Sequence, residues 1–480
     1  MSLNQRIYKL GLVIIFIALL TSYLFKLSNH CIYIWDESIY ANNSLEMSVT
    51  KNLLYYTNDY EKNYFNVKPP LVIILQALSL SLFGYSEFAL RLPTLMFFLG
   101  SIILLIFYSK KLFKDYIVGA EASIFLFLCI GAVRPHVFLS ADLDAGLVFF
   151  SLLLLLNHLD VCESKQLNKK HWIIYFSSII FGWLSKSTGI FLVIPALFAI
   201  SIYYRNLSIF LRDRRLYLAI LAVLLFIGFY YFYKYQTDPY YTQLVWETEY
   251  MRFVENIMPW HQQPFSYYFV NTVSHFALVH WLGLLIILIV AIKKNRVAKV
   301  QYALLLAIAI YLLTISIPAV KLEWYDAFIY PALCLLLSIS IDNFFTTDQK
   351  WLRFSVNVTL CLLMVIFFES KTKTFYSGIS SQELEGDFLK NTNTQYPSLK
   401  VLKKVEDDKT EHYNVVRFYL KRNEILDTTF SQKIIAGVNV VQLYDTILCC
   451  DKSQIDSLQG LHNSLLLQKR NNCFVYKIIK

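Results

Sequence analysis

The stretch that decides the fold is Leu10–Leu24, LGLVIIFIALLTSYL, a strongly apolar run without a charged residue. Two blocks of the same kind follow, LYLAILAVLLFIGFYYF at Leu216–Phe232 and LLLAIAIYLLTISI at Leu304–Ile317. With their flanks, such blocks reach the roughly 17–25 residues that an α-helix needs to cross a bilayer. The 480 residues are 56% hydrophobic and only 16% charged, whereas soluble domains carry about a quarter charged residues. The sequence therefore predicts an all-α polytopic membrane domain.

The distribution of basic residues predicts the orientation of these helices. A net charge of +10 alone could indicate nucleic-acid binding, but the Lys and Arg residues lie between apolar blocks, where they mark cytoplasmic loops. We expect a cytoplasmic N-terminus, with Arg6 and Lys9, and an uncleaved first helix, because no small-residue cleavage pattern follows it. The connectors expected to be cytoplasmic contain Lys110, Lys111, Lys114, Lys165, Lys169, Lys170, Arg205, Arg212, Arg214, Arg215, Lys293, Lys294, Arg296, Lys299, Lys350 and Arg353.

The alternation of apolar and basic segments predicts about eleven transmembrane helices. The apolar stretch Leu71–Phe83 is too short to span, so an interfacial or re-entrant helix fits it better. This choice places the C-terminus outside the cytoplasm. The expected spans lie near 10–24, 88–108, 118–135, 143–158, 172–186, 189–204, 216–233, 270–292, 300–318, 326–341 and 352–368.

After Glu369 the composition becomes mixed, so the sequence predicts two domains: a transmembrane domain, 1–369, with an extracytoplasmic loop at 28–70, and a small soluble α/β domain, 370–480. In the tail, Asp451–Leu458 is typical of a capped helix. Of the eight cysteines, we expect Cys449 and Cys450 to pack rather than bridge, and a disulfide elsewhere in the tail stays open. Residues rich in β-branched and aromatic side chains, typical of strands, are Tyr413–Leu420, Val438–Cys450 and Cys473–Ile479.

Most of the unusual polar residues fall on the extracytoplasmic side of this topology. They gather at junctions of loops and helices, which favours a catalytic crater over a conduit, because transporters place charges near the bilayer midplane. The residues are Asp36, Glu37, Lys68, Glu87, Arg91, Arg134, His136, Asp142, Asp144, Lys186, Glu247, Glu249, Arg252, His261, Lys321 and Glu323.

Two motifs near the start of the chain have both a structural and a chemical interpretation. Asp36 and Glu37 could be first-turn acids of an amphipathic helix, Ser38–Ser48. They could equally supply a general base or bind a divalent metal. Lys68, before two prolines, could be a snorkelling lysine at a helix start, or it could hold a phosphate.

The later motifs are equally ambiguous when each is taken alone. Asp144 opens a predicted span and could be an N-cap, and Lys186 could be an interface anchor in a turn. Lys321 precedes aromatic residues that match an interfacial belt. His261, with the nearby Glu249, could be a metal ligand, although one histidine and one glutamate do not make a metal site.

The order of these motifs carries a family resemblance. Asp36-Glu37 with Tyr40-Ala41 is followed by Lys68-Pro-Pro-Leu, and then by Leu82-Phe-Gly-Tyr-Ser-Glu-Phe-Ala-Leu-Arg-Leu-Pro93. This order resembles the bacterial branch of the GT-C membrane glycosyltransferases. It is similar to the aminoarabinose transferases that modify lipid A and, more distantly, to protein O-mannosyltransferases. Further matches are Asp144 with Leu147 and Phe149-Phe150, Lys186, His261 with Pro264-Phe265 and Tyr267-Tyr268, Ser316 with Lys321-Leu322, and Tyr330-Pro331.

The resemblance implies a sugar donor linked to a polyprenyl phosphate, and inverting transfer on the extracytoplasmic face. It implies that Asp36 is the base, that Glu37 is its partner, that Lys68 holds the donor phosphate, and that Asp144 lies near the acceptor. Cations that could stabilise the leaving phosphate are Lys68, Arg252, Lys186, Arg91 and Lys321. The family commonly has an acidic residue directly before this lysine, but here the residue is Val67. A divalent metal is therefore in doubt, although His261 could bind one with Glu249 or Glu37.

The expected protein is thus a glycosyltransferase of the bacterial inner membrane, with a lipid, glycan or protein acceptor and no nucleic-acid partner. The alternative is a polytopic transporter or flippase of lipid-linked sugars. That alternative predicts charges in mid-helix and symmetry between two halves, and the sequence shows neither. A structural or assembly protein would leave the ordered motifs on the outer face without a reason.

Overall fold

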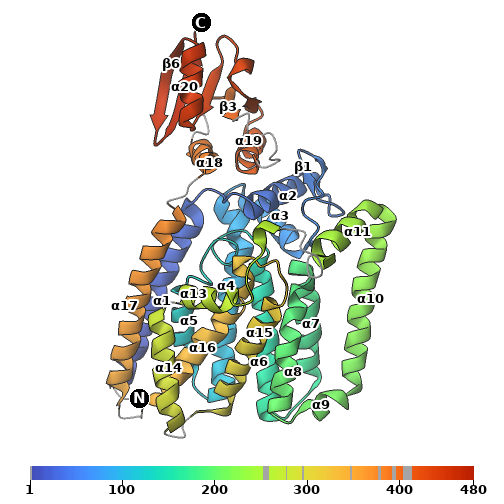
Figure 1. Cartoon of the computed structure of the whole chain (residues 1–480), viewed down its shortest axis with the longest axis vertical. Coiled ribbons are helices and arrows are strands. Elements are labelled where there is room, and N and C mark those ends of the chain that lie inside the picture. Colours follow the sequence, from blue (N-terminus) through green and yellow to red (C-terminus); the bar gives the residue numbers. More distant parts are fainter. Residues whose placement is uncertain are drawn as a thin grey trace. The chain divides into compact units, whose positions relative to one another are not determined.

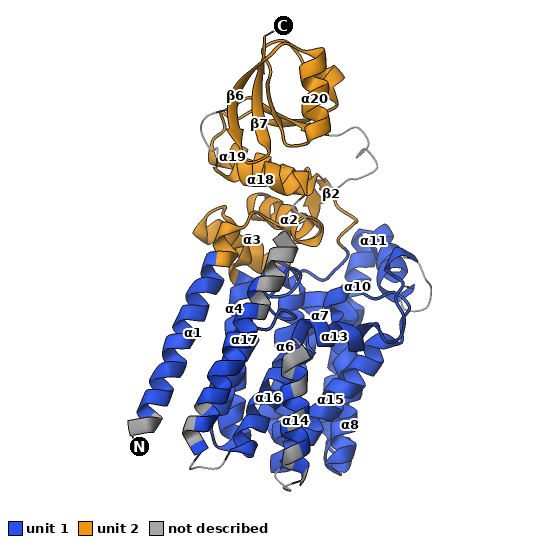
Figure 2. Ribbon diagram, turned by 60° about the vertical axis from the view of Figure 1, so that its left-hand side comes forward, with its two compact units in different colours: residues 1–25, 67–72, 93–372 blue, residues 26–66, 73–92, 373–480 orange. Residues whose placement is uncertain are grey.

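The structure is a computed structural model that describes residues 3–251, 259–276, 278–293, 297–345, 349–376, 380–391, 396–403 and 413–479. Its contacts divide the chain into two compact units, which Figure 2 colours separately. Unit 1 comprises residues 1–25, 67–72 and 93–372, and unit 2 comprises residues 26–66, 73–92 and 373–480. The predicted loop at 28–70 and the predicted tail domain at 370–480 thus fall largely in the same unit.

Unit 1 is built almost entirely from helices, and its long helices run roughly alongside one another in Figure 1. Among the described residues, the neighbouring helices α6 and α7 pack extensively against each other. The helical elements that lie wholly or mainly in unit 1 are α1 (Leu3–Asn29), α4 (Glu87–Phe113), α5 (Tyr116–Phe127), α6 (Asp144–Ser164), α7 (Lys169–Lys186), η1 (Ser187–Val193), α8 (Ile194–Tyr203), α9 (Leu207–Leu211), α10 (Arg214–Thr237), α11 (Pro239–Val245), η2 (Trp246–Tyr250), η3 (Pro259–His261), α13 (Tyr267–Phe276), α14 (Leu278–Lys293), α15 (Lys299–Ser316), η4 (Glu323–Asp326), α16 (Ile329–Phe344) and α17 (Lys350–Tyr376).

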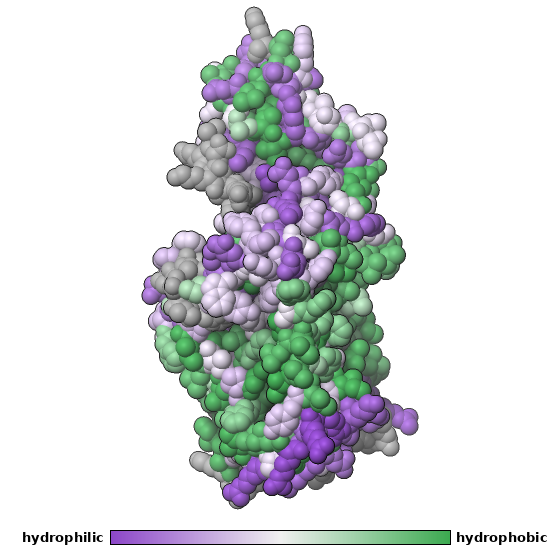
Figure 3. All heavy atoms as spheres, turned by 90° about the vertical axis from the view of Figure 1, so that its right-hand side faces the viewer, coloured by the Kyte–Doolittle hydropathy of each residue, from purple (hydrophilic) through white to green (hydrophobic). Residues whose placement is uncertain are grey.

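The helices of unit 1 confirm a multi-pass membrane protein. Within the described ranges, seven helical segments are long and apolar enough to cross a bilayer, and three shorter apolar helices accompany them. The surface of helix α10 is typical of contact with lipid, because its apolar side chains Leu218, Leu224 and Phe229 are each more than 60% exposed. Figure 3 shows the corresponding apolar band on the helices of unit 1, with hydrophilic side chains gathered at their lower end. The number of about eleven spans stays a prediction.

Three of the predicted spans differ in detail from the observed helices, and one of them, 189–204, is divided between η1 and α8. The predicted span 118–135 is only the helix α5, which ends at Phe127, and turns lead from there to Asp144. Tertiary packing holds these turns, because Gly131 lies so close to the ring of Tyr330 that a Cβ would come within 2.2 Å of it. The predicted span 270–292 is divided between α13 and α14.

The chain-initial part of unit 2 consists of two helices and a hairpin. Helix α2 (Asp36–Thr50) precedes a small antiparallel hairpin of β1 (Thr57–Asn58) and β2 (Glu61–Lys62). Helix α3 (Leu71–Phe83) has the predicted bounds and lies in this unit from Ile73 onward. The predicted amphipathic helix Ser38–Ser48 is a helix, but every one of its residues is buried. It is therefore a core helix of unit 2 rather than a half-exposed one.

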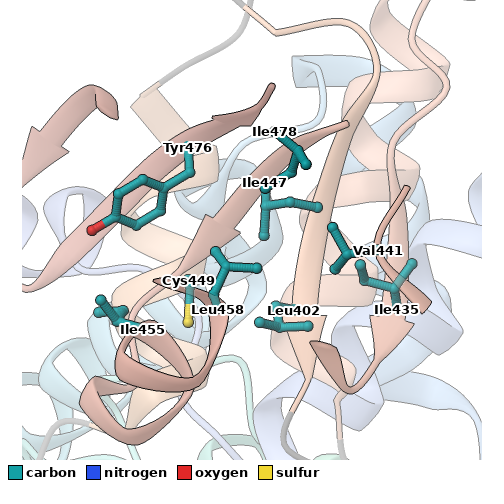
Figure 4. Packing of buried hydrophobic residues seen from close by; sticks show 9 residues of the cluster. All are labelled: Leu402, Ile435, Val441, Ile447, Cys449, Ile455, Leu458, Tyr476 and Ile478. Atoms are coloured by element: carbon teal, nitrogen blue, oxygen red, sulfur yellow. The ribbon is translucent and has the colours of Figure 1, made fainter. Parts of the chain in front are cut away.

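The tail confirms the predicted small α/β domain. Five strands form one mixed sheet in the order β4-β3-β5-β7-β6, in which β3 pairs in parallel with β4 and β5. Ile447 and Leu458 belong to the core between this sheet and α20 (Figure 4). The elements are α18 (Ser381–Asn391), β3 (Leu399–Lys403), α19 (Asn414–Leu426), β4 (Lys433–Ala436), η7 (Val438–Val440), β5 (Thr446–Cys449), α20 (Lys452–Leu461), β6 (Ser464–Arg470) and β7 (Cys473–Ile478).

Four local predictions in the tail have different outcomes. The predicted strand Cys473–Ile479 is β7, and the predicted capped helix is α20, where Asp451 accepts a hydrogen bond from Gln454 N at 3.1 Å. The predicted strand Tyr413–Leu420 is wrong, because this segment is helix α19. Its β-branched residues favour a strand only weakly, and tertiary burial of one helical face overrides that preference. Of the predicted strand Val438–Cys450, only Thr446–Cys449 is a strand.

The cysteine expectation is also corrected. Cys450 does not merely pack but forms a disulfide with Cys473, while Cys449 is a free, buried thiol. The two bonded cysteines flank the antiparallel pair of β5 and β7, which sheet pairing brings together although 23 residues separate them in the chain. Sheet register, which the cysteine spacing does not reveal, decided this pairing.

Candidate active site

Asp36 begins helix α2 directly after a strained residue. Trp35 has φ 72° and ψ −124°, a conformation that costs a residue other than glycine about 1–3 kcal/mol. Its carbonyl accepts hydrogen bonds from Ser38 Oγ at 2.8 Å and from Ile39 N at 3.1 Å. Strain of this kind persists only where the surroundings fix the chain, and it concentrates at functional sites. The sharp turn leaves Asp36 half-buried at the head of the helix.

Glu37, the next residue, is fully buried in an ion pair with Arg91 of α4. Arg91 Nε and a terminal nitrogen reach the two carboxylate oxygens of Glu37 at 2.7 and 2.8 Å. The remaining donors of Arg91 reach the carbonyls of Leu27, His30 and Cys31 at 2.8–2.9 Å. A guanidinium has five N–H donors, so Arg91 has none left for a phosphate. The geometry thus indicates that Arg91 and Glu37 hold the loop in place and do not contact a substrate directly.

Two helices of the tail hold the same loop from the other side. Tyr419 on α19 accepts a hydrogen bond from Ile32 N at 3.1 Å and donates one to Glu87 at 2.7 Å. Burial, and then the Glu87 carboxylate, raise the pKa of Tyr419 well above its usual value, so the hydroxyl keeps its proton. On α18, Glu383 accepts a hydrogen bond from Ile34 N at 3.4 Å. Residues 31–34, which lead into Asp36, are therefore positioned by side chains more than 340 residues away in the chain.

Unit 1 brings four of the predicted site residues into one cavity. Lys68 precedes α3, Asp144 opens α6, Lys186 ends α7 and Glu249 lies on the π-helical turn η2. All four line a small cavity of about 50 Å³, whose aromatic wall consists of Tyr311, Trp324, Tyr325 and Phe328. Lys186 ends its helix at a sharp break, where Ser187 has φ 50°.

The positive charge of each lysine in this cavity is balanced by a carboxylate. Lys68 is ion-paired with Glu249, and Lys186 with Asp144. The Lys186 ammonium also lies 5.3 Å from the centre of the Tyr325 ring, a cation–π contact. A buried ammonium group is stable only beside an anion. The cavity thus contains two ion pairs beside an aromatic wall.

A second polar network braces the aromatic wall. His275 lies between Glu323 at 3.0 Å and the hydroxyl of Tyr330 at 3.0 Å, and that hydroxyl donates to Asp326 at 2.6 Å. Arg134 completes the network with an ion pair to Glu323 at 2.7 Å. The sequence analysis missed His275 and Asp326. The spacing of Asn271 and His275 on α13 was the available signal, because both reach this network from one face of the helix.

The segment before Asp144 contacts the same wall. His136, which has φ 68°, stacks on Trp324 with 3.8 Å between ring centres. It also lies 3.5 Å from Asp142, which accepts a hydrogen bond from Ser140 at 2.5 Å. Burial alone would raise the pKa of Asp142, but His136 and Ser140 lower it below the usual value. The carboxylate is therefore ionised and keeps the His136 ring in place against Trp324.

The remaining predicted residues lie elsewhere. Lys321 does not line the cavity, because its ammonium donates to the carbonyls of Gln263 at 3.1 Å and Pro318 at 2.5 Å. Burial lowers the pKa of Lys321. Arg252 falls outside the described residues. His261 is half-buried in η3, and its carbonyl accepts a hydrogen bond from Lys321 N at 3.0 Å.

The predicted metal pair does not form a ligand set in the part of the chain that the structure describes. Neither His261 nor Glu249 belongs there to a group of three potential ligands close enough to share an ion. The Glu249 carboxylate is ion-paired with Lys68 instead. A metal at His261 and Glu249 therefore stays a prediction, and no catalytic step is assigned to a metal.

Comparison with known proteins agrees with the fold and the motifs. A family model described as dolichyl-phosphate-mannose-protein mannosyltransferase matches residues 67–232. Over 391 residues the chain is 28% identical to the undecaprenyl phosphate-alpha-4-amino-4-deoxy-L-arabinose arabinosyl transferase of Wigglesworthia glossinidia brevipalpis. This similarity covers 78% of the chain and 67% of that relative.

Two crystal structures of ArnT from Cupriavidus metallidurans share the fold over almost the whole chain. The structure bound to undecaprenyl phosphate gives a TM-score of 0.67 and covers 97% of both chains. The apo structure gives 0.64 and covers 98% of both. Identity is 14% in both cases, so this similarity shows the fold.

The chain has the fold of the ArnT structures, and its fold and motifs together are similar to those of the GT-C class of membrane glycosyltransferases. Within that class the chain is similar to the aminoarabinose transferases, as the order of the sequence motifs predicted. These similarities lie with glycosyltransferases, and they give no support to the transporter alternative.

Proposed function

We propose that this protein is a glycosyltransferase that moves a sugar from a polyprenyl-phosphate carrier to a lipid, glycan or protein hydroxyl. The observation that carries this proposal is the cavity of unit 1, which Lys68 and Lys186 line together. When the bond between the anomeric carbon and the phosphate oxygen breaks, its electron pair stays with the phosphate. Two ammonium groups beside an aromatic wall stabilise this developing charge more than they stabilise the intact donor.

The carboxylates of the cavity have a matching role. Glu249 and Asp144 balance the positive charge of the two lysines while no donor is bound, and the donor phosphate takes their place. This exchange lets buried cations exist without a ligand, because an anion is present in both states. Asp144 is then freed from Lys186 at the moment when the sugar arrives.

We assign the role of general base to Asp36, at the head of α2. Inverting transfer requires a carboxylate on the acceptor side, which takes the proton of the attacking hydroxyl as the new glycosidic bond forms. Among the acidic pair, Glu37 is fully buried with Arg91, whereas Asp36 is half-buried. Glu37 therefore acts as a positioning residue for the turn that presents Asp36.

For orientation, we propose a cytoplasmic N-terminus and an extracytoplasmic tail in the bacterial inner membrane. The disulfide Cys450–Cys473 supports this assignment, because disulfides persist in oxidising compartments such as the periplasm. The basic connectors support it independently through the positive-inside rule. To test the compartment of the tail, the wild type and a variant with both cysteines replaced by serine are compared by alkylation in intact cells.

The experiment that tests the function uses purified protein and the donor named in its relative, 4-amino-4-deoxy-L-arabinose on undecaprenyl phosphate. Asp36→Asn should bind the donor but transfer no sugar, and Lys68→Ala should lose both donor affinity and transfer. Lys452→Ala, at an exposed site of α20, is the matched control for loss of a lysine. Full transfer by Asp36→Asn would contradict the assigned base.

A further inference from the structure

Unit 2 contains a polar cleft of about 370 Å³ that the proposed chemistry does not use. Its walls come from the β1–β2 hairpin and the chain after it, from α2 and from α19. The volume is in the range of small-ligand pockets, roughly 300–1,000 Å³. All of its lining residues belong to unit 2.

The hairpin that forms one wall is held in a strained turn. Asp59 and Tyr60 have φ of 58° and 62°, which is unusual for residues other than glycine. Both of their backbone N–H groups donate to the carboxylate of buried Glu46, at 2.8 and 3.0 Å. Lys421 of α19 is ion-paired with Glu46 and lies 2.8 Å from Asp59. A buried ion pair thus keeps the wall in place without a ligand.

The opposite wall is α19, which is joined to the hairpin by polar contacts. Asn414 Oδ1 accepts a hydrogen bond from Asn58 Nδ2 at 3.1 Å, and Arg417 lies 3.3 Å from the Asp59 carboxylate. No donor among the described residues reaches Oδ1 of Asn58, although this atom is shielded from solvent. A buried acceptor of this kind is rare and calls for a partner.

The side chains of the cleft combine planar polar groups with aromatic rings. Asn58, Asn63 and Arg417 offer amide and guanidinium groups, and Tyr64 and Phe65 offer rings, with Phe65 58% exposed. Planar amides and guanidinium groups match the hydroxyls of a sugar, and an aromatic ring matches its apolar face. Aliphatic surface is scarce, because Ile39 is the one aliphatic residue in the described lining.

We propose that this cleft binds the saccharide part of the acceptor. The proposal rests on the proposed glycosyltransferase function and adds the place where the acceptor is recognised. Ile39, which lines the cleft, lies three residues after Asp36 on α2, about 4.5 Å along the helix axis. A saccharide in the cleft is therefore held next to the turn of helix that carries the assigned base.

Binding without turnover tests the proposal directly. Full-length protein in detergent is titrated with deacylated lipid A, with maltose and with a Ser/Thr-rich peptide, and binding is followed by saturation-transfer NMR. We expect the phosphorylated saccharide to bind, and Arg417→Ala and Phe65→Ala to weaken it at least tenfold. Arg470→Ala is the matched control, because Arg470 is also a partly exposed arginine near an aspartate, Asp387, but lies outside the cleft.

Kinetics separate this proposal from the function on which it rests. The cleft variants should raise the acceptor KM at least tenfold while donor hydrolysis by water stays within twofold of wild type. Saccharide binding that both variants leave unchanged, tighter binding of the peptide, or no binding of either saccharide would overturn the cleft proposal. Absence of both transfer and hydrolysis in the wild type would overturn the donor chemistry instead, while the binding result still decides the cleft.

Discussion

Replacement of Tyr419 by Phe tests whether the tail positions the catalytic loop. Tyr419 is fully buried, and its hydroxyl joins Ile32 N to the Glu87 carboxylate. The Phe side chain fills the same space but leaves the Ile32 N–H without its acceptor, which costs about 1–3 kcal/mol. Glu87 keeps Arg422 at 3.4 Å and Lys390 at 3.5 Å, so the carboxylate stays compensated.

The consequence for catalysis follows from the position of Ile32. It lies four residues before Asp36 in the loop that α18 and α19 hold, and displacement of a catalytic group by about 1 Å can cost around 100-fold in rate. We expect Tyr419→Phe to lower kcat at least tenfold while donor affinity changes less than twofold. Steady-state transfer assays and donor titrations on the purified variant measure the two quantities.

The control for this prediction is Tyr476→Phe, which removes another hydrogen-bonded hydroxyl in the tail. Tyr476 is buried in the sheet core and accepts a hydrogen bond from Gln459 at 2.9 Å. It should lower thermal stability but leave kcat within twofold of wild type. Equal losses of kcat in both variants, or an unchanged kcat in Tyr419→Phe, would refute a positioning role for the tail.

Four further predictions follow from the contacts. Arg91→Ala removes the cationic partner of the buried Glu37 carboxylate and should destabilise unit 2 by about 3–5 kcal/mol, which a thermal melt measures; a melt like that of wild type would contradict the buried pair. Glu249→Gln removes the anion that competes with the donor phosphate for Lys68, so the donor Kd should fall several-fold. A higher Kd would argue against exchange of the carboxylate for the phosphate. Cys450→Ser opens a bridge across 23 residues and should cost about 3 kcal/mol, a loss that reductant should reproduce in the wild type. Burial, and then Arg91, lower the pKa of His30 to about 4, so His30 takes up a proton less readily in the folded protein than in the unfolded chain. Its contribution to the free energy of unfolding should therefore be full above pH 6.5 and disappear toward pH 4. His30→Gln should remove this pH dependence when the free energy of unfolding is measured against pH.

The membrane class and most helices were predictable because hydrophobic length and lysine position act locally in the sequence. Leu71–Phe83 is such a case, since its shortness alone distinguishes it from a span, and it forms a helix with these bounds. The strand prediction at Tyr413–Leu420 failed because burial of one helical face overrode local preference. The pairing of Cys450 with Cys473 was not predictable because sheet register creates it.

The site shows the same division between local and long-range information. Motif order identified Lys68, Asp144 and Lys186, whereas Glu249 was predicted only as a possible metal ligand. All four residues line one cavity of unit 1. The sequence did not reveal that each lysine has one of these carboxylates as its partner. Nor did it reveal that every N–H donor of Arg91 forms a hydrogen bond with Glu37 or with one of three carbonyls. Such assignments depend on contacts between residues far apart in the chain.

The central claim is that a sugar–phosphate bond is broken at the two lysines of unit 1. The most direct measurement is the product balance of purified protein in nanodiscs that hold a radiolabelled polyprenyl-phosphate sugar and an acceptor. The account predicts glycosylated acceptor and free polyprenyl phosphate in equal amounts, and neither product with Lys68→Ala. Intact donor that moves across the bilayer without release of polyprenyl phosphate would contradict it.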